Sequence, residues 1–227
     1  MPSHTPKIEV AQRLRDVPLF EALDDAIMLE MATTAQWREY GAGEVIVLEG
    51  EAQPGLYFLD YGYVKVVKVS PAGREQTLRI LEPGETFNEI GVFTRRPNPA
   101  TAIALEPAGV WLIRREALVR LLAEHPAFGQ SVMEKMAERM LFLVSLVTDL
   151  SLRPVTGRLA RLVLESAASD VMPRPRWFTQ AELAARLGTV PDVIQRSLRS
   201  LETDGLIAVE RQQIRVLNRP ALEELAA

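Results

Sequence analysis

The segment from residue 178 to residue 202 constrains the fold of this chain more than any other, because its pattern predicts two short helices joined by a tight turn. Thr179 can cap the first helix, and Glu182, three residues later, completes a capping box. Gly188 can adopt the left-handed conformation that ends a helix, and Pro191 is well tolerated in the first turn of the next helix. The segment therefore predicts a helix-turn-helix unit.

The second predicted helix has an apolar face and a polar face. Its apolar side chains recur at helical spacing, and they are Val193, Ile194, Leu198 and Leu201. The opposite side is left to Asp192, Gln195, Arg196 and Arg199. Arginine and glutamine can make bidentate contacts with the edges of guanine and adenine. A helix of this kind fits the major groove of DNA.

The residues that follow favour the same interpretation. Residues 205–217 predict two short strands around a polar turn, which is the wing of a winged helix. Residues 153–227 hold eleven arginines and nine acidic residues but no lysine, a balance of +2 in a chain of net charge −4. An arginine-only basic surface suits phosphate and base contacts. The alternative is an ordinary helical hairpin with a solvated charged face, which the modest charge difference alone does not exclude.

The composition of the chain excludes several classes of redox, metal and catalytic site. The chain has no cysteine, so disulfides, thiolate nucleophiles, iron–sulfur clusters and Cys-ligated haem or zinc are excluded. Histidine occurs only at His4 and His125, for which we expect no ligand role, and we expect neither a metal nor a cofactor. No catalytic constellation is present, so we do not expect an enzyme. With no membrane-length apolar run and no apolar leader segment, we expect a cytoplasmic protein that does not enter a membrane.

Upstream of the helix-turn-helix the hydrophobic pattern changes twice. Residues 8–35 are helical in pattern, whereas residues 37–114 alternate short β-rich runs with turn signals. Turns about every 10 to 12 residues predict an antiparallel barrel or sandwich. A long helix is predicted from Pro126 to Leu152, and it ends at Arg153-Pro154 because proline disfavours helix in the preceding residue. We expect the domain boundary there.

The long helix is apolar on two sides, which is too hydrophobic for a helix that covers one domain and faces water. We expect one side to pack on the barrel and the other on a second copy of the chain. The alternative is a helix buried wholly within its own chain. The predicted dimer interface consists of Val132, Met136, Leu143, Val147 and Leu150.

A β-barrel, a long helix and a winged helix-turn-helix, in this order, resemble the Crp/Fnr family of bacterial transcription regulators. The matching segments are residues 40–50 and 56–66 in the barrel, 83–93 at the family's phosphate-binding cassette, and 155–160 at the start of its DNA-binding domain. The resemblance implies an α+β fold with an antiparallel β-roll of double-stranded β-helix or jelly-roll type. The implied domains are a β-roll sensor domain with N-terminal helices (1–125), a dimerisation helix (126–153) and a winged helix-turn-helix domain (154–227).

The cassette departs from the cyclic-AMP-binding members of the family. Those members use a glycine, a glutamate for the ribose hydroxyl and an Arg-Ser pair for the cyclic phosphate, where this chain has Asn88, Glu89 and Ala100-Thr101. A buried phosphate needs a charged partner, and Arg95 and Arg96 are expected to be solvated loop residues instead. The family's polar contacts to the purine, on the long helix, fall at Leu143 and Val144, whose side chains cannot hydrogen-bond a base. The expected effector pocket consists of Asn88, Glu89, Ala100, Thr101, Leu143 and Val144.

We therefore do not expect cyclic AMP to bind in the family's manner. Either an unknown small effector occupies the pocket, or side chains fill it and the regulator acts without a ligand. The carbon-monoxide-sensing haem members use Cys and His ligands in the barrel, and this barrel has neither.

The resemblance also implies roles in the recognition helix. The family commonly has an Arg-Glu pair followed by an arginine, where this chain has Pro191, Asp192 and Arg196. We expect Arg196 to contact a base, whereas Arg199 and Thr179 contact phosphates. The expected DNA-binding residues are Thr179, Gln180, Asp192, Gln195, Arg196 and Arg199.

The function that the resemblance implies is a homodimeric, sequence-specific DNA-binding transcription regulator. Its expected partners are double-stranded DNA with a twofold-symmetric operator, a second copy of the chain and RNA polymerase, which some members touch through the region of residues 165–177. The alternative is a sensor module whose C-terminal domain binds protein instead of DNA.

Overall fold

The structure is a computed structural model that describes residues 7–21, 23–52 and 54–227, so His4 lies outside the described residues. The chain forms two compact units. One consists of Met1–Lys68 with Arg79–Phe142, and the other of Val69–Leu78 with Leu143–Ala227.

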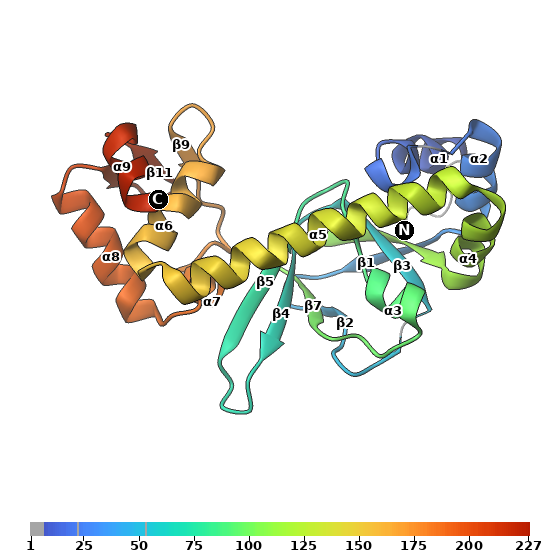
Figure 1. Ribbon diagram of the computed structural model, residues 1–227, viewed down its shortest axis with the longest axis horizontal. Coiled ribbons are helices and arrows are strands. Elements are labelled where there is room, and N and C mark those ends of the chain that lie inside the picture. The colour runs from blue at the N-terminus through green and yellow to red at the C-terminus, as the bar shows by residue number, and fades with distance from the viewer. Residues whose placement is uncertain (1–6, 22, 53) are drawn as a thin grey trace. The chain divides into compact units, whose positions relative to one another are not determined.

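The first unit contains a β-roll flanked by helices (Figure 1). Its helices are α1 (Lys7–Arg15), the 3₁₀ helix η1 (Pro18–Phe20), α2 (Asp25–Thr34), α3 (Glu89–Thr94) and α4 (Arg115–Glu124). The strands of the roll are β1 (Gln36–Tyr40), β2 (Val45–Val47), β3 (Gly55–Tyr61), β4 (Val64–Val69), β5 (Glu75–Leu81), β6 (Thr86–Phe87), β7 (Thr101–Ala104) and β8 (Ala108–Arg114). The end of β4 at Val69 and residues 75–78 of β5 are grouped with the second unit.

The strands form two four-stranded sheets, in the orders β1-β8-β3-β6 and β2-β7-β4-β5. Pairing in the first sheet is antiparallel throughout, with Phe58 opposite Trp111 and Trp37 opposite Trp111 on its other side. The antiparallel β-roll that the resemblance implied is confirmed, and the predicted turns fall between successive elements of the unit.

Residues 55–59 of β3 are all buried. Since alternate side chains point to opposite sides of a strand, β3 is buried on both of its faces. Tyr57 and Leu59 lie in the core of the roll, where Tyr57 stacks on Phe87 with ring centroids 5.0 Å apart. Leu56 and Phe58 belong to a second core, formed with α1, α2, α4 and the beginning of the long helix α5 (Pro126–Leu152). The sheet β1-β8-β3-β6 is therefore the middle layer of this unit.

The second unit is a winged helix. It contains α6 (Val155–Ser166), β9 (Val171–Pro173), α7 (Gln180–Leu187), α8 (Pro191–Thr203), β10 (Ile207–Val209), β11 (Gln213–Val216) and α9 (Arg219–Ala226). Strands β10 and β11 form the predicted wing, and β9 adds a third antiparallel strand beside β11 that the sequence pattern did not predict. One apolar core joins α6, α7, α8 and the wing.

Helix α5 spans the predicted residues and ends before Pro154 (Figure 1). Its residues up to Phe142 belong to the first unit and those from Leu143 to the second. Among the helices that the structure describes, we find none with the length and apolar character needed to cross a membrane.

Candidate functional site

The helix-turn-helix consists of α7, a turn at residues 188–190, and α8. The Thr179 hydroxyl caps α7 by accepting a hydrogen bond from the backbone N–H of Glu182 at 3.2 Å. The Glu182 carboxylate is buried and accepts a hydrogen bond from the Thr77 hydroxyl at 3.2 Å. Gly188 ends α7 in the left-handed conformation (φ 65°), and its N–H donates to Ala184. Local sequence thus determines both the start and the end of the first helix.

Helix α8 separates its two faces cleanly. Its buried side chains, Ile194, Ser197, Leu198 and Leu201, lie on the side that packs into the core of the winged helix. The side chains that we expected to read DNA are all exposed, at the start of α7 and along α8: Thr179, Gln180, Asp192, Gln195, Arg196 and Arg199. The structure therefore leaves the predicted DNA-contacting side chains free to meet a ligand.

The arginines of this unit fall into two groups. Arg161 pairs with Glu165 at 2.7 Å and Arg219 pairs with Asp170 at 2.7 Å. These hydrogen bonds raise the pKa of both guanidinium groups. By contrast, Arg196 and Arg199 make no ion pair or hydrogen bond through their side chains with any residue that the structure describes. Two guanidinium groups without an ion pair thus lie on the exposed face of α8.

The wing adds a cation that the sequence pattern did not single out. Arg211 lies in the turn between β10 and β11, is exposed, and has no carboxylate partner among the described residues. Its neighbour Arg215 is held by Glu210 at 2.7 Å. The polar character of this turn was the only signal in the sequence. Exposed unpaired arginines in a wing are suited to contacts with the phosphate backbone.

In the cassette, the glutamate that the family uses for a ribose hydroxyl is already engaged. Glu89 is only 1% exposed and accepts a hydrogen bond from the Thr86 hydroxyl at 2.6 Å. Arg139 of α5 forms an ion pair with the Glu89 carboxylate and also donates to the Thr86 carbonyl at 2.7 Å. Sequence reasoning missed Arg139, although a charged residue three positions after Met136 and four before Leu143 interrupts an apolar stripe.

Other residues of the predicted pocket also make hydrogen bonds within the chain. Asn88 takes a left-handed conformation (φ 73°) at the position where relatives have glycine, and its side-chain N–H donates to the Gly55 carbonyl at 2.6 Å. The Thr101 hydroxyl accepts from the N–H of Glu49 at 3.1 Å, and Ala100 is buried. Both loop arginines, Arg95 and Arg96, are exposed. Leu143 and Val144 belong to the second unit, and their place in a pocket stays a prediction.

Two residues of the predicted dimer interface on α5 pack within their own unit. Val132 is only 8% exposed and Met136 is half-buried, and both pack against the helices and the sheet of the first unit. At about 100° per residue, Arg139, Leu143 and Leu150 lie along this same line of the helix. The Arg139–Glu89 ion pair holds this side of α5 against the β-roll within the first unit. Leu143 and Leu150 belong to the second unit, and their place in an interface stays a prediction.

A neighbouring line of α5 is apolar and exposed instead. It consists of Met133, Met140, Val144 and Val147, spaced seven, four and three residues apart and more than 60% exposed. Of the five residues predicted for the interface, only Val147 lies on this line. Sequence reasoning found two apolar sides, and periodicity does not show which side meets the barrel, so the residues that meet a second copy stay a prediction.

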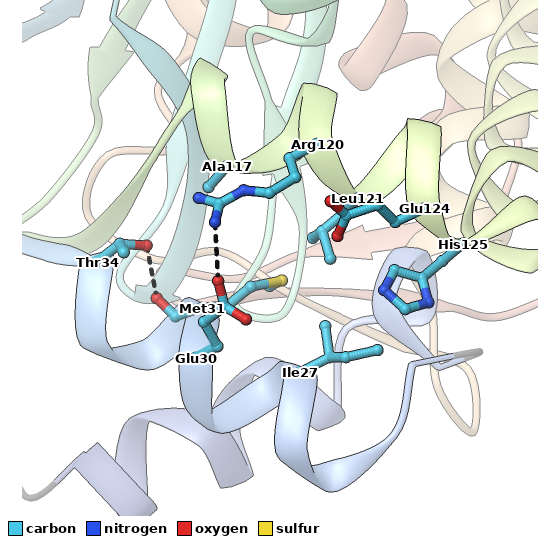
Figure 2. A pocket seen from close by; sticks show the side chains of 9 residues that line it. All are labelled: Ile27, Glu30, Met31, Thr34, Ala117, Arg120, Leu121, Glu124 and His125. Atoms are coloured by element: carbon cyan, nitrogen blue, oxygen red, sulfur yellow. Dashed lines mark hydrogen bonds and ion pairs between the residues drawn. The ribbon is translucent and has the colours of Figure 1, made fainter.

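A small cavity lies between α2 and the end of α4 (Figure 2). Its volume is about 20 Å³, which suffices for about one water molecule. The Glu30–Arg120 ion pair, 3.2 Å long, stands at its edge, and His125 lines it. A cavity of this size cannot hold a nucleotide-sized effector.

Both halves of the chain match known families. Residues 37–125 match the cyclic nucleotide-binding domain, and residues 157–225 match the Crp-like helix-turn-helix domain. The two matches follow each other in the order of the β-roll and the winged helix.

Whole-length relatives show the same combination. The cyclic AMP receptor protein of Thermus thermophilus is 26% identical over 213 residues, covering 94% of this chain and 98% of the relative. A CRP-like cAMP-activated global transcriptional regulator of Mycobacterium tuberculosis is 23% identical over 214 residues, covering 92% and 96%. The structure of FixK2 from Bradyrhizobium japonicum matches with a TM-score of 0.76 and 23% identity, covering 85% of this chain and 98% of that one. The chain therefore belongs to the Crp/Fnr family of transcription regulators, whose members bind DNA and are not enzymes.

Proposed function

We propose that this regulator binds a twofold-symmetric DNA operator as a homodimer in the cytoplasm, and that it does so without cyclic AMP. The observation that carries the proposal is the polar face of α8, where Arg196 and Arg199 are exposed and have no partner among the described residues. Arginine on a recognition helix is the commonest reader of guanine in the major groove.

The dimer is supported by the exposed line of α5. Its spacing of seven, four and three residues fits the heptad repeat of a helix that packs against a partner helix. Exposed contiguous apolar surface of this kind marks an interaction site. Two recognition helices related by a twofold axis would read half-sites about one DNA turn apart, which is roughly 34 Å.

Independence from cyclic AMP is supported by the cassette. Its glutamate is neutralised by Arg139, its threonine hydroxyl is bound to backbone, and Ala100 stands where a phosphate-binding arginine would be required. A cyclic phosphate placed there would be desolvated without a cation, which is costly.

A second candidate is gating by another small effector. Two buried polar atoms close to Glu89 lack partners among the described residues: the Asn88 side-chain oxygen and the Arg139 Nε–H. An effector that offers both a hydrogen-bond donor and an acceptor would satisfy them. If the regulator acts as an activator, RNA polymerase is a further expected partner.

The test is DNA selection followed by affinity measurement. The purified protein is mixed with a randomised duplex library, and the enriched sequence is titrated by fluorescence anisotropy at several salt concentrations. We expect an enriched inverted repeat whose affinity falls steeply as salt rises. Arg196→Ala should remove the base preference at one position of each half-site, whereas Arg219→Ala, which removes a paired arginine, should leave the enriched sequence unchanged. A protein that enriches no DNA would instead support the sensor module that binds protein.

A further inference from the structure

We infer that Val190 and Pro191 contact the methyl group of a thymine in each half-site, an inference that rests on the DNA binding proposed above. Val190 is the N-cap residue of α8 and is 50% exposed, and Pro191 is the first residue of the helix and is also exposed. Together they form a small apolar surface at the beginning of a helix whose outer face is otherwise polar.

Val190 is an unusual residue for this position. Serine, threonine, aspartate and asparagine are preferred at the N-cap because their side chains accept a hydrogen bond from a free backbone N–H. In the same unit Thr179 caps α7, and Asn218 caps α9 through the N–H of Ala221 at 3.2 Å, whereas α6, with Pro154 as its N-cap, has no side-chain cap. At α8 no side chain makes a cap hydrogen bond. The exposed apolar side chain at the start of α8 is therefore not explained by capping.

The position of the pair is appropriate for reading a base. In helix-turn-helix proteins the N-terminal residues of the recognition helix contact base edges. Pro191 lies one turn before Gln195 on the exposed side. It precedes Arg196 by five residues, or about 7.5 Å along the axis, which corresponds to about two base-pair steps of roughly 3.4 Å.

The chemistry of the pair selects one base. Among the groups that base pairs present in the major groove, the C5-methyl of thymine is the apolar one. Valine and proline side chains offer no hydrogen-bond donor or acceptor, and Pro191 also lacks a backbone N–H. They therefore cannot read the acceptors of guanine, but they can bury a methyl group. The expected half-site has a thymine about two base pairs from the guanine that Arg196 contacts.

The experiment uses the full-length protein and the operator enriched from the random library. Replacing the expected thymine with deoxyuridine removes only the methyl group. We expect the wild-type affinity to fall about fourfold, the effect of one buried methyl group. Deoxyuridine in place of a thymine outside the half-sites serves as the DNA control and should leave the affinity unchanged.

Two variants assign the effect to the protein. Val190→Ser supplies a capping hydroxyl, so it should retain or stabilise α8 while the thymine-to-uracil affinity ratio falls toward one. Pro191→Ser is the second variant and should lower the same ratio. Pro220→Ser is the matched control, because Pro220 is an exposed proline in the first turn of α9, and its ratio should equal that of the wild type.

Two results would overturn the inference while leaving DNA binding intact. One is an enriched half-site with no thymine near the guanine. The other is equal wild-type affinity for thymine and uracil operators. A library with no enriched sequence would instead overturn the DNA binding on which the inference rests.

Discussion

Arg196 and Arg211 carry the same charge but differ in what they can reach, one on the recognition helix and the other in the wing. Arg196→Ala should cost about 1–3 kcal/mol in operator binding and relax specificity at one base pair per half-site. Arg211→Ala should weaken operator and scrambled DNA alike and reduce the salt slope by about 1 per protomer. Anisotropy titrations of both duplexes at several salt concentrations measure the difference. Equal losses on both duplexes for Arg196→Ala would show that it contacts phosphate, not a base.

Arg139 is expected to matter for stability, because its removal leaves the Glu89 carboxylate buried without a cation. Arg139→Ala should lower the free energy of unfolding by about 3 kcal/mol, as for other broken buried pairs, measured by urea denaturation. Replacing both partners, as Glu89→Leu with Arg139→Met, should recover most of this loss.

The control for this prediction is Arg120→Ala. Arg120 pairs with Glu30 at the surface, where both side chains are more than half exposed, so its loss should cost less than about 1 kcal/mol. A loss for Arg139→Ala as small as that of Arg120→Ala would show that Glu89 does not depend on the ion pair.

At the scale of elements, the sequence predicted what is specified locally. The extent of α5 and the two helices around Gly188 follow from apolar periodicity, capping residues and proline, all of which lie within a few positions of each other. Strand β9 has three residues and pairs with β11, about forty positions later, so no local pattern could predict it. The cassette residue Glu89 could be placed from the resemblance, but its partner Arg139 lies 50 positions away on another helix.

The sequence pattern of α5 likewise does not show which of its two apolar lines meets a second copy of the chain, and this leads to a prediction. Val147→Glu places a charge in the proposed dimer contact, where it would be desolvated. We expect the dimer to dissociate at micromolar concentration, as measured by sedimentation equilibrium, and operator affinity to fall with it. Ile8→Glu is the control, because Ile8 on α1 is 66% exposed, close to the 62% of Val147. Unchanged dimer mass in Val147→Glu would exclude this line of α5 as the contact.

At the scale of the whole molecule, the domain order of the family is retained while both ligand-contacting regions depart from the chemistry of its cyclic-AMP-binding members. Pro191 stands where they have a base-reading arginine, and Ala100 stands where they have a phosphate-binding one. The exposed, unpaired arginines of α8 need no effector in order to present their charge. DNA binding by this chain should therefore be independent of the nucleotide that activates relatives such as the Mycobacterium tuberculosis regulator.

Titration with cyclic AMP tests this independence directly. Calorimetry up to about 1 mM nucleotide should give no saturable heat, because an unpaired buried phosphate forfeits the few kcal/mol that separate millimolar from micromolar affinity. Operator affinity should be the same with and without the nucleotide, since a ligand shifts an equilibrium only through differential binding. Micromolar binding would contradict the prediction and would mean that a cation from elsewhere in the chain reaches the phosphate. The exposed Arg95 and Arg96 would then be the first candidates for alanine substitution.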